Sequence, residues 1–112
     1  MPLVLLAFAP ADRFAADTVR NALTEAGLTC DIAPQDGAAR SAIVAAASVP
    51  RALVIVHSRA SVGDVAILRV AEAAAGRRLP MLVVRLDDTK PASGLRTFLR
   101  GMPSIDAAGG KL

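Results

Sequence analysis

Residues 51–86 read RALVIVHSRASVGDVAILRVAEAAAGRRLPMLVVRL, and this stretch alone predicts a strand, a helix and a second strand. Residues 52–56 form a short apolar, largely β-branched run, which is typical of a strand buried on both faces. The alanine-rich pattern over residues 62–75 predicts a helix that Gly76 ends, and residues 80–86 predict the second buried strand. Two neighbouring buried strands joined through a helix lie parallel, with a right-handed crossover. We therefore expect a parallel sheet.

The segments on either side continue this alternation. The pattern predicts strands over residues 3–7, 28–32, 52–56, 80–86 and 103–107, and helices over residues 12–26, 38–47, 62–75 and 94–100. Such an order is typical of an α/β fold with a flavodoxin-like, doubly wound, parallel five-stranded sheet. We expect one α/β domain over residues 1–107, without a helix after the last strand, and a linker or tail over residues 108–112.

Two helix starts and one buried face follow from residue type and spacing. Ser61 is a candidate N-cap of the central helix, with Asp64 three residues later as its acidic partner. Asp12 is a candidate N-cap of the first helix, which Gly27 closes. The residues of the first helix expected to face the sheet are Phe14, Val19, Ala22, Leu23 and Ala26.

Composition limits the possible partners. The chain has 112 residues, of which 54% are hydrophobic, but its only aromatic residues are Phe8, Phe14 and Phe98. Little is therefore available for stacking on bases, and a net charge of +3 does not indicate nucleic acid or a membrane. Acidic residues outnumber basic ones over residues 1–39, and the reverse holds afterwards. This is either ordinary solvated surface or an acidic side of one copy that meets a basic side of the next.

Single residues exclude further classes of site. Cys30 and His57 each occur once, which excludes an internal disulfide, a cysteine-based metal site and a site with several histidines. The apolar N-terminus has no preceding Lys or Arg and is short for a signal peptide, so we interpret it as the first strand. No run reaches the length of a membrane span, and we expect a cytoplasmic protein.

The loops after the strands are where ligands meet such sheets. Residues 8–12 contain no glycine, which excludes a dinucleotide or P-loop phosphate cradle. His57 and Ser58 follow the central strand, and without an orienting third group they are more often satisfied loop residues than a nucleophile and its base. Asp12, Asp31 and Asp36 have no recognised metal-ligand spacing, so we expect no metal.

The central helix has two aliphatic residues away from its predicted buried face. Ile67, Val70 and Ala71 belong to the face expected against the sheet, whereas Val65 and Leu68 lie outside it. Single exposed aliphatic residues are ordinary on protein surfaces. The alternative is that Val65 and Leu68 form a packing surface for a second protein.

With these elements placed, the sequence resembles a bacterial Toll/interleukin-1 receptor (TIR) domain. The first conserved box of that family is a strand that ends in Ser-aromatic, a short loop with Asp, and an amphipathic helix that ends in Gly. Phe8, Asp12, Phe14 and Gly27 match this box, while Ala7 stands where the family usually has Ser.

The similarity continues through the rest of the chain, over roughly residues 3–107. Asp36 and Gly37 resemble the loop after the second strand, which contributes to self-association in the family. The central strand that ends at Ser58, with Ser61 after it, and the strand that begins at residues 79–80 match the second half of the family pattern.

The resemblance also implies a possible activity, from which this chain departs. TIR enzymes cleave NAD with a glutamate on the helix after the central strand, and that position falls on Ile67. An aliphatic side chain neither acts as a base nor stabilises an oxocarbenium ion. The acids on or beside this helix are Asp64 and Glu72, and the family's usual Trp is absent from the region of Gly63.

Two functions follow from the resemblance. The leading hypothesis is a catalytically inactive signalling module, without a cofactor, that associates with other TIR domains and with itself through Asp36, Gly37, Val65 and Leu68. The alternative is an NAD nucleosidase, with NAD as substrate, Glu72 or Asp64 as the acid, and Phe8, Ala9 and Pro10 in contact with the nucleotide. A small-ligand-binding flavodoxin-like domain is a third possibility, for which the sequence has no motif.

Overall fold

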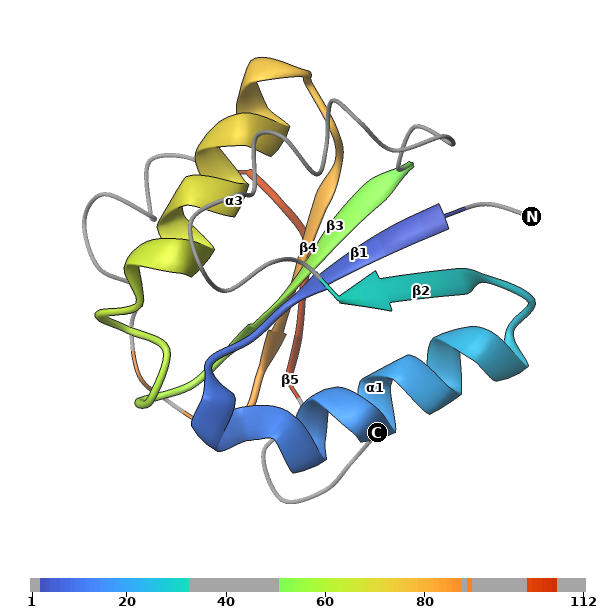
Figure 1. Cartoon of the computed structure of the whole chain (residues 1–112), viewed down its shortest axis with the longest axis horizontal. Helices are drawn as coiled ribbons and strands as arrows, with labels where there is room; N and C mark the ends of the chain where they lie inside the picture. Colours follow the sequence, from blue (N-terminus) through green and yellow to red (C-terminus); the bar gives the residue numbers. More distant parts are fainter. Residues whose placement is uncertain (1–2, 33–50, 88, 90–100, 107–112) are drawn as a thin grey trace.

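The structure is a computed structural model that describes residues 3–32, 51–87, 89 and 101–106. Its centre is a five-stranded, all-parallel sheet (Figure 1). The strands are β1 (Leu3–Ala7), β2 (Thr29–Ile32), β3 (Ala52–His57), β4 (Met81–Arg85) and β5 (Ser104–Asp106). Their order in the sheet is β2-β1-β3-β4-β5, with β1, β3 and β4 inside and β2 and β5 at the edges. The predicted flavodoxin-like α/β sheet is confirmed.

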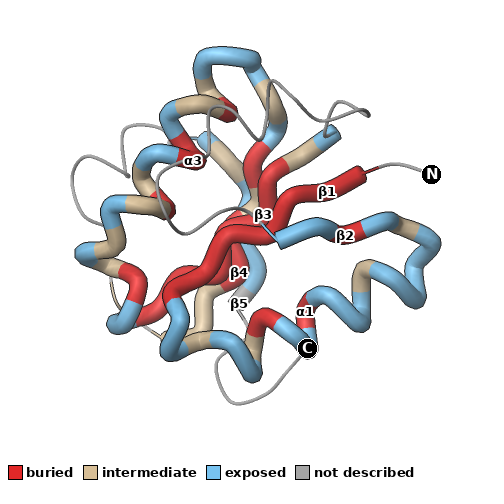
Figure 2. The backbone as a smooth tube through the Cα atoms, in the orientation of Figure 1, coloured by how far each residue is buried: buried red, intermediate tan, exposed pale blue. Residues whose placement is uncertain are grey.

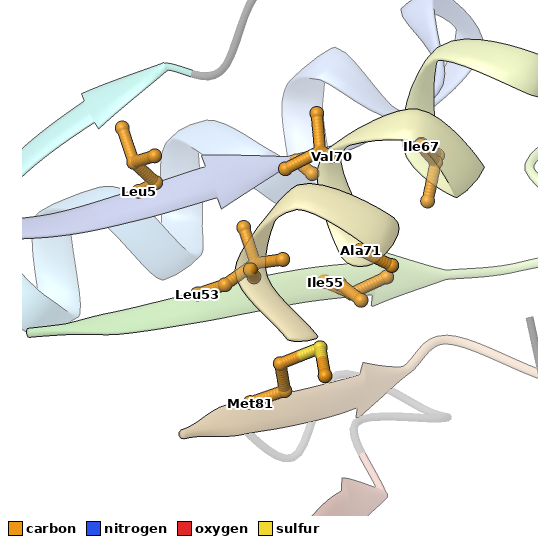
Figure 3. Close-up of a cluster of buried hydrophobic side chains, with 9 residues drawn as sticks. Leu5, Leu53, Ile55, Ile67, Val70, Ala71 and Met81 are labelled. Carbon is orange, nitrogen blue, oxygen red and sulfur yellow. The ribbon is translucent and has the colours of Figure 1, made fainter. Parts of the chain in front are cut away.

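One described helix lies on each face of the sheet. Helix α1 (Arg13–Glu25) follows β1, and helix α3 (Val65–Gly76) connects β3 to β4 (Figure 1). Side chains of a strand alternate between the two faces, so neighbouring residues of β1 and β3 contact different helices. The α3 face holds Leu5, Ala7, Leu53, Ile55, Met81 and four residues of α3, seven of which Figure 3 labels. The α1 face holds Val4, Leu6, Phe8, Val54, Val56 and Val84 with Ala16 and Val19 of α1.

The central strands are the most buried part of the molecule. Figure 2 shows buried residues along β1 and β3, and exposed residues along β2 and the outer surfaces of both helices. On β2 only Cys30 is buried, as expected for a strand with one covered face at the edge of a sheet. Its thiol is free, and burial, partly offset by nearby Arg20, raises its pKa.

Helix α1 turns a different face to the sheet than its sequence predicted. Its buried residues are Ala16 and Val19, with Leu23 packed beside them, whereas Phe14 is 92% exposed. Ala22 and Ala26 are also exposed. Successive helical residues are about 100° apart, so Phe14 lies about 200° from Ala16, on the solvent side. The predicted inward face was wrong for these three residues.

Local sequence explains where α1 begins and where it ends. A short 3-10 turn, η1 (Pro10–Asp12), leads into the helix. Asp12 is the N-cap residue, as predicted, but its side chain makes no capping hydrogen bond. Gly27 follows the helix with φ +90°, a conformation that favours glycine, as predicted for a residue that ends a helix.

Helix α3 begins later than its sequence predicted. The N-cap is Asp64, whose Oδ1 accepts a hydrogen bond from the Ile67 N–H at 3.2 Å. Ser61 lies in the preceding turn and does not cap the helix, which corrects the prediction. At the other end Arg78 has φ +57°, and the Leu79 N–H bonds to the Ala74 carbonyl to close the helix. Arg78 thus occupies a left-handed position where glycine would be less strained.

The remaining predicted elements lie outside the described residues. These are the helices over residues 38–47 and 94–100, the tail over residues 108–112, and the loop that contains Asp36 and Gly37. Among the helices that the structure describes, none is long and apolar enough to cross a membrane.

Candidate functional site

Polar side chains gather where β1, β3 and β4 end. In a parallel sheet these carboxyl ends share one edge, and the connecting loops meet there. His57 is the last residue of β3 and lies opposite Arg85, the last residue of β4. Asp12 comes from the turn after β1, Ser58 and Ser61 from the turn after β3, and Asp87 and Thr89 from the segment after β4. We use the name carboxyl-edge cluster for six of these residues: Asp12, His57, Ser58, Ser61, Asp87 and Thr89.

Ser58 joins the loop after β3 to the loop after β1. Its hydroxyl donates a hydrogen bond to Oδ2 of Asp12, a residue 46 positions earlier in the chain. The same oxygen accepts the Ala60 N–H at 3.1 Å. Ser58 is buried, and both its donor and an acceptor site are in use. The Asp12 carboxylate therefore holds two loops together instead of capping α1.

His57 and Ser61 form a second, fully enclosed pair. The imidazole is 0% exposed, and its Nε2 lies 2.9 Å from the Thr89 carbonyl oxygen. A carbonyl oxygen only accepts, so Nε2 carries the proton in this contact. Nδ1 lies 3.1 Å from the Ser61 Oγ. Both ring nitrogens of His57 are therefore occupied by groups of the protein itself.

Ser61 Oγ is the centre of this arrangement. It accepts the Ser58 N–H at 2.9 Å and lies 3.0 Å from the Ser58 carbonyl oxygen, in addition to its contact with His57. Ser61 is 2% exposed. Its role is to satisfy the backbone of the turn after β3, which is a tertiary role that the helix-capping prediction missed.

Asp87 closes the outer side of the cluster. Its two oxygens accept the Arg59 N–H and the Thr89 N–H, each at 2.9 Å. The hydrogen bond from the Arg59 backbone, followed by those from Thr89, lowers the pKa of Asp87, and nearby His57 adds to this effect. The carboxylate thus fixes the loop after β4 against the turn after β3.

The geometry of the carboxyl-edge cluster is that of residues that hold the loops together, and not that of a catalytic nucleophile with its base. The Ser61 to His57 distance is that of a nucleophile and its base, but both side chains are buried and the third partner is a backbone carbonyl. Every buried side-chain nitrogen or oxygen of the described residues has a hydrogen-bond partner. The described residues also hold no group of three His, Cys, Asp or Glu side chains placed to bind a metal.

The side chains of the two acids predicted to serve NAD cleavage, Asp64 and Glu72, form no hydrogen bond with the carboxyl-edge cluster that the structure shows. The Asp64 carboxylate caps α3, and Glu72 is exposed two turns further along the helix. Ile67, to which the TIR resemblance assigns the position of the catalytic glutamate, points into the core between α3 and the sheet (Figure 3). Of the residues expected to contact a nucleotide, Phe8 and Ala9 are buried and Pro10 is exposed. Their contact with a nucleotide stays a prediction.

The residues named for docking separate into three cases. Val65 is 62% exposed at the first turn of α3, as expected for a packing surface. Leu68 lies outside the fully buried face of α3, as predicted, but it is half-buried and packs against the core of the α3 face, so its role in docking stays a prediction. Asp36 and Gly37 lie outside the described residues. Phe14 is an exposed apolar residue that the prediction missed, although the spacing of Ala16, Val19 and Leu23 identifies the opposite face as the buried one.

Comparison with known proteins adds information on the fold. No protein-family model and no curated protein matches the sequence. Among solved structures the chain is similar to a 3-dehydroquinate dehydratase-like protein from Bifidobacterium longum, with a TM-score of 0.56 and 17% sequence identity. The similarity covers 95% of this chain and 84% of that one. At this level of identity the comparison supports the α/β fold alone.

Proposed function

We propose that this domain is a TIR-like protein–protein interaction module that associates with other TIR domains, including copies of itself, and performs no catalysis. The observation that carries the proposal is a contrast at one edge of the sheet. The polar residues of the carboxyl-edge cluster are bonded within the chain, whereas Val65 and Phe14 expose their apolar side chains beside it. In the described residues, this edge offers contact surface, while the side chains of the carboxyl-edge cluster are engaged in hydrogen bonds within the chain.

The positions of Val65 and Phe14 follow from the topology. Each lies in the first turn of a helix that starts from the carboxyl end of a strand. Helices α1 and α3 cover opposite faces of the sheet, so the two residues flank the edge on different sides (Figure 1). A single exposed apolar residue is ordinary. Two on separate faces give one domain two places at which to contact neighbouring domains.

The alternative, cleavage of NAD, has weaker support. It requires an acid that reaches the reacting sugar carbon, whereas the Asp64 carboxylate is engaged as a helix cap and Glu72 projects from the exposed surface of α3. Nicotinamide release by the purified domain tests this alternative. Release that Glu72→Gln or Asp64→Asn abolishes, with the fold intact by circular dichroism, would replace the proposed function.

The proposed function is tested by replacing Val65. Light scattering over a concentration series should show that the wild-type domain gains mass, and that Val65→Asp, which places a charge in the contact, remains closer to the monomer mass. Ala22→Asp is the matched control because it adds the same carboxylate to an exposed position on the other helix. Equal association of wild type and Val65→Asp would remove Val65 from the interface. A wild-type domain that stays monomeric at every concentration would contradict the function itself.

A further inference from the structure

Three exposed arginines lie at the amino end of the sheet, opposite the carboxyl-edge cluster. Arg51 immediately precedes β3, and Arg77 and Arg78 follow the last turn of α3, just before β4 begins. Strands β3 and β4 are neighbours in the sheet, and their pairing begins at Leu53 and Met81. Arg51 and Arg78 therefore come two and three residues before the first paired residues of adjacent strands. We call Arg51, Arg77 and Arg78 the basic group.

No negative charge balances the basic group in the described part of the chain. None of its three guanidinium groups forms an ion pair with a described residue. The sequence has no Asp or Glu over residues 37–63 or over residues 73–86, the two runs that contain these arginines. Glu72 is exposed earlier on α3, with Arg69 three residues before it. Glu25 ends α1, which leads into β2, and β1 separates β2 from β3.

Arg78 has a backbone conformation that favours a different residue. Its φ is +57°, in the left-handed region that glycine adopts without strain. The chain has a glycine two positions earlier, at residue 76, and an arginine where the left-handed conformation occurs. The negative end of the α3 dipole favours cations at Arg77 and Arg78, but Arg51 belongs to no described helix. Strain at an exposed position is explained by a contact that the side chain makes with a partner.

The described residues at this end of the sheet limit the kind of partner. Planar guanidinium groups suit carboxylates and phosphates. Binding of single-stranded nucleic acid relies on aromatic side chains that stack on bases, and no described residue before β3 or β4 is aromatic. Binding in a membrane surface requires exposed apolar anchors. The large exposed apolar residues lie elsewhere, in the first turns of the helices or on the edge strands: Phe14, Val65, Ile32 and Ile105.

We propose that the basic group binds an acidic peptide segment, a short run of Asp or Glu, of a partner protein. Adjacent strands lie about 4.8 Å apart, and alternate residues of an extended peptide are about 6.6 Å apart. Carboxylates along one side of such a segment therefore match the separation of Arg51 and Arg78 within the reach of their long side chains. The basic group lies at the opposite end of the sheet from Val65 and Phe14. It gives the domain a second contact surface, beyond the proposed association with TIR domains.

Binding of a labelled peptide of ten glutamates, measured by fluorescence anisotropy at 0.1 M salt, tests the proposal. The first triple variant removes the basic group: Arg51→Gln, Arg77→Gln and Arg78→Gln. It should bind the peptide at least about tenfold more weakly than the wild-type domain. The matched control removes three exposed arginines from the two helices: Arg13→Gln, Arg20→Gln and Arg69→Gln.

The control separates a defined surface from the effect of net charge. Charges that lie more than about 10 Å from the peptide are largely screened at 0.1 M salt, so the control should lose less than about threefold in affinity. An equal loss in the two triple variants would overturn the proposal, because general attraction to a basic protein would then explain the binding. Thermal unfolding shows whether both variants are folded.

Arg78→Gly separates the role of this side chain from its effect on the fold. Glycine adopts the left-handed conformation freely, so this variant should unfold at the same temperature as the wild type or at a higher one. It should nevertheless bind the glutamate peptide about threefold more weakly, since one ion pair is lost. A glycine variant that binds the peptide as tightly as the wild type would contradict the proposal, because the strained arginine would then make no contact.

Two further probes distinguish the other anionic partners. A single-stranded DNA of ten nucleotides and vesicles that contain phosphatidylserine replace the peptide in the same measurements. If either binds more tightly than the peptide, and the basic group is required, the acidic peptide is overturned as the occupant. A folded wild-type domain that does not bind the peptide overturns it as well. Neither result affects the proposed self-association, which is measured by molecular mass and not by peptide binding.

Discussion

The hydroxyl of Ser61 connects a buried imidazole to the backbone of a tight turn. It is within 3.1 Å of the Ser58 N–H, the Ser58 carbonyl oxygen and His57 Nδ1. Water cannot replace a missing partner easily at this depth, so an unsatisfied group here carries its full desolvation cost. The packing of the carboxyl-edge cluster therefore depends on a side chain that is almost entirely shielded from solvent.

Replacement of Ser61 by alanine should destabilise the domain. Ser61→Ala leaves the buried Ser58 N–H and His57 Nδ1 without their acceptor and donor, which costs about 1–3 kcal/mol. Urea unfolding followed by circular dichroism measures the change. Thr18→Ala is the matched control, because the Thr18 hydroxyl bonds to the Phe14 carbonyl on the exposed side of α1 and its loss should change stability by less than about 0.5 kcal/mol. Equal effects of the two variants would contradict this role for Ser61.

Asp87 should make stability depend on pH in the acid range. Its pKa is lower in the folded protein, chiefly because of the Arg59 backbone hydrogen bond, so the ionised form stabilises the fold above the unfolded pKa of about 3.9. That contribution is lost as the pH falls through the folded pKa. Asp87→Asn should therefore be less stable than wild type at neutral pH, and the difference should shrink below about pH 4.

Urea unfolding at a series of pH values checks this prediction. Asp17→Asn removes an exposed carboxylate of α1 that accepts no hydrogen bond from a described residue, and it serves as the control. A constant difference between Asp87→Asn and wild type from neutral to acid pH would contradict the expected linkage.

The positions of individual residues were predictable from the sequence, but their hydrogen-bond partners were not. The loop positions of His57 and Ser58 follow from the end of a recognisable strand, and the satisfied role of Ser58 was favoured from the sequence. The bond from Ser58 to Asp12 spans 46 residues, and no local pattern encodes it. Ser61 and Asp64 are both good N-cap residues, and only the tertiary contact of Ser61 with His57 decides that Asp64 caps the helix.

Helix α3 is the element to which the resemblance to NAD-cleaving TIR domains assigns a catalytic glutamate. Its inward face is formed by Ile67, Val70, Ala71 and Ala74, and the first three of these were predicted to face the sheet. Full burial of a side chain such as Ile67 or Val70 stabilises the fold by about 2 kcal/mol. The helix is therefore held by apolar packing at the very position where a catalytic glutamate would be needed.

Introduction of that glutamate should damage the fold without creating an enzyme. Ile67→Glu places a carboxylate in the core against β1 and β3, which should lower the free energy of unfolding by more than about 3 kcal/mol. Ile67→Val should cost about 0.5–1.5 kcal/mol. Arg69→Glu, which adds the same group at an exposed position, should change stability by less than about 0.5 kcal/mol.

Thermal unfolding and a nicotinamide-release assay on the three variants check this expectation. A stable Ile67→Glu protein that cleaves NAD would show that residue 67 reaches a substrate site, in contradiction to its buried position.

For α1 the element was predictable but its orientation was not. The large apolar Phe14 suggested an inward face, whereas packing on the sheet selects the smaller Ala16 and Val19.

The whole molecule combines a conventional parallel sheet with a carboxyl edge whose polar residues hydrogen-bond to one another. The alternation of buried strands and helices was enough to predict five parallel strands, because a strand that is apolar on both faces requires cover on both faces. The proposed docking surface was less predictable, because the exposure of Phe14 and the partial burial of Leu68 follow from packing on the sheet and not from local sequence pattern.

The molecular mass of the wild-type domain as a function of its concentration tests the central claim most directly. Sedimentation equilibrium at low salt, from dilute to concentrated samples, should give a mass that rises continuously above that of the 11.5 kDa monomer. Such a rise is expected of a domain that binds copies of itself, because association follows mass action. A mass that stays at 11.5 kDa over the whole range would contradict the account of this chain as a self-associating module.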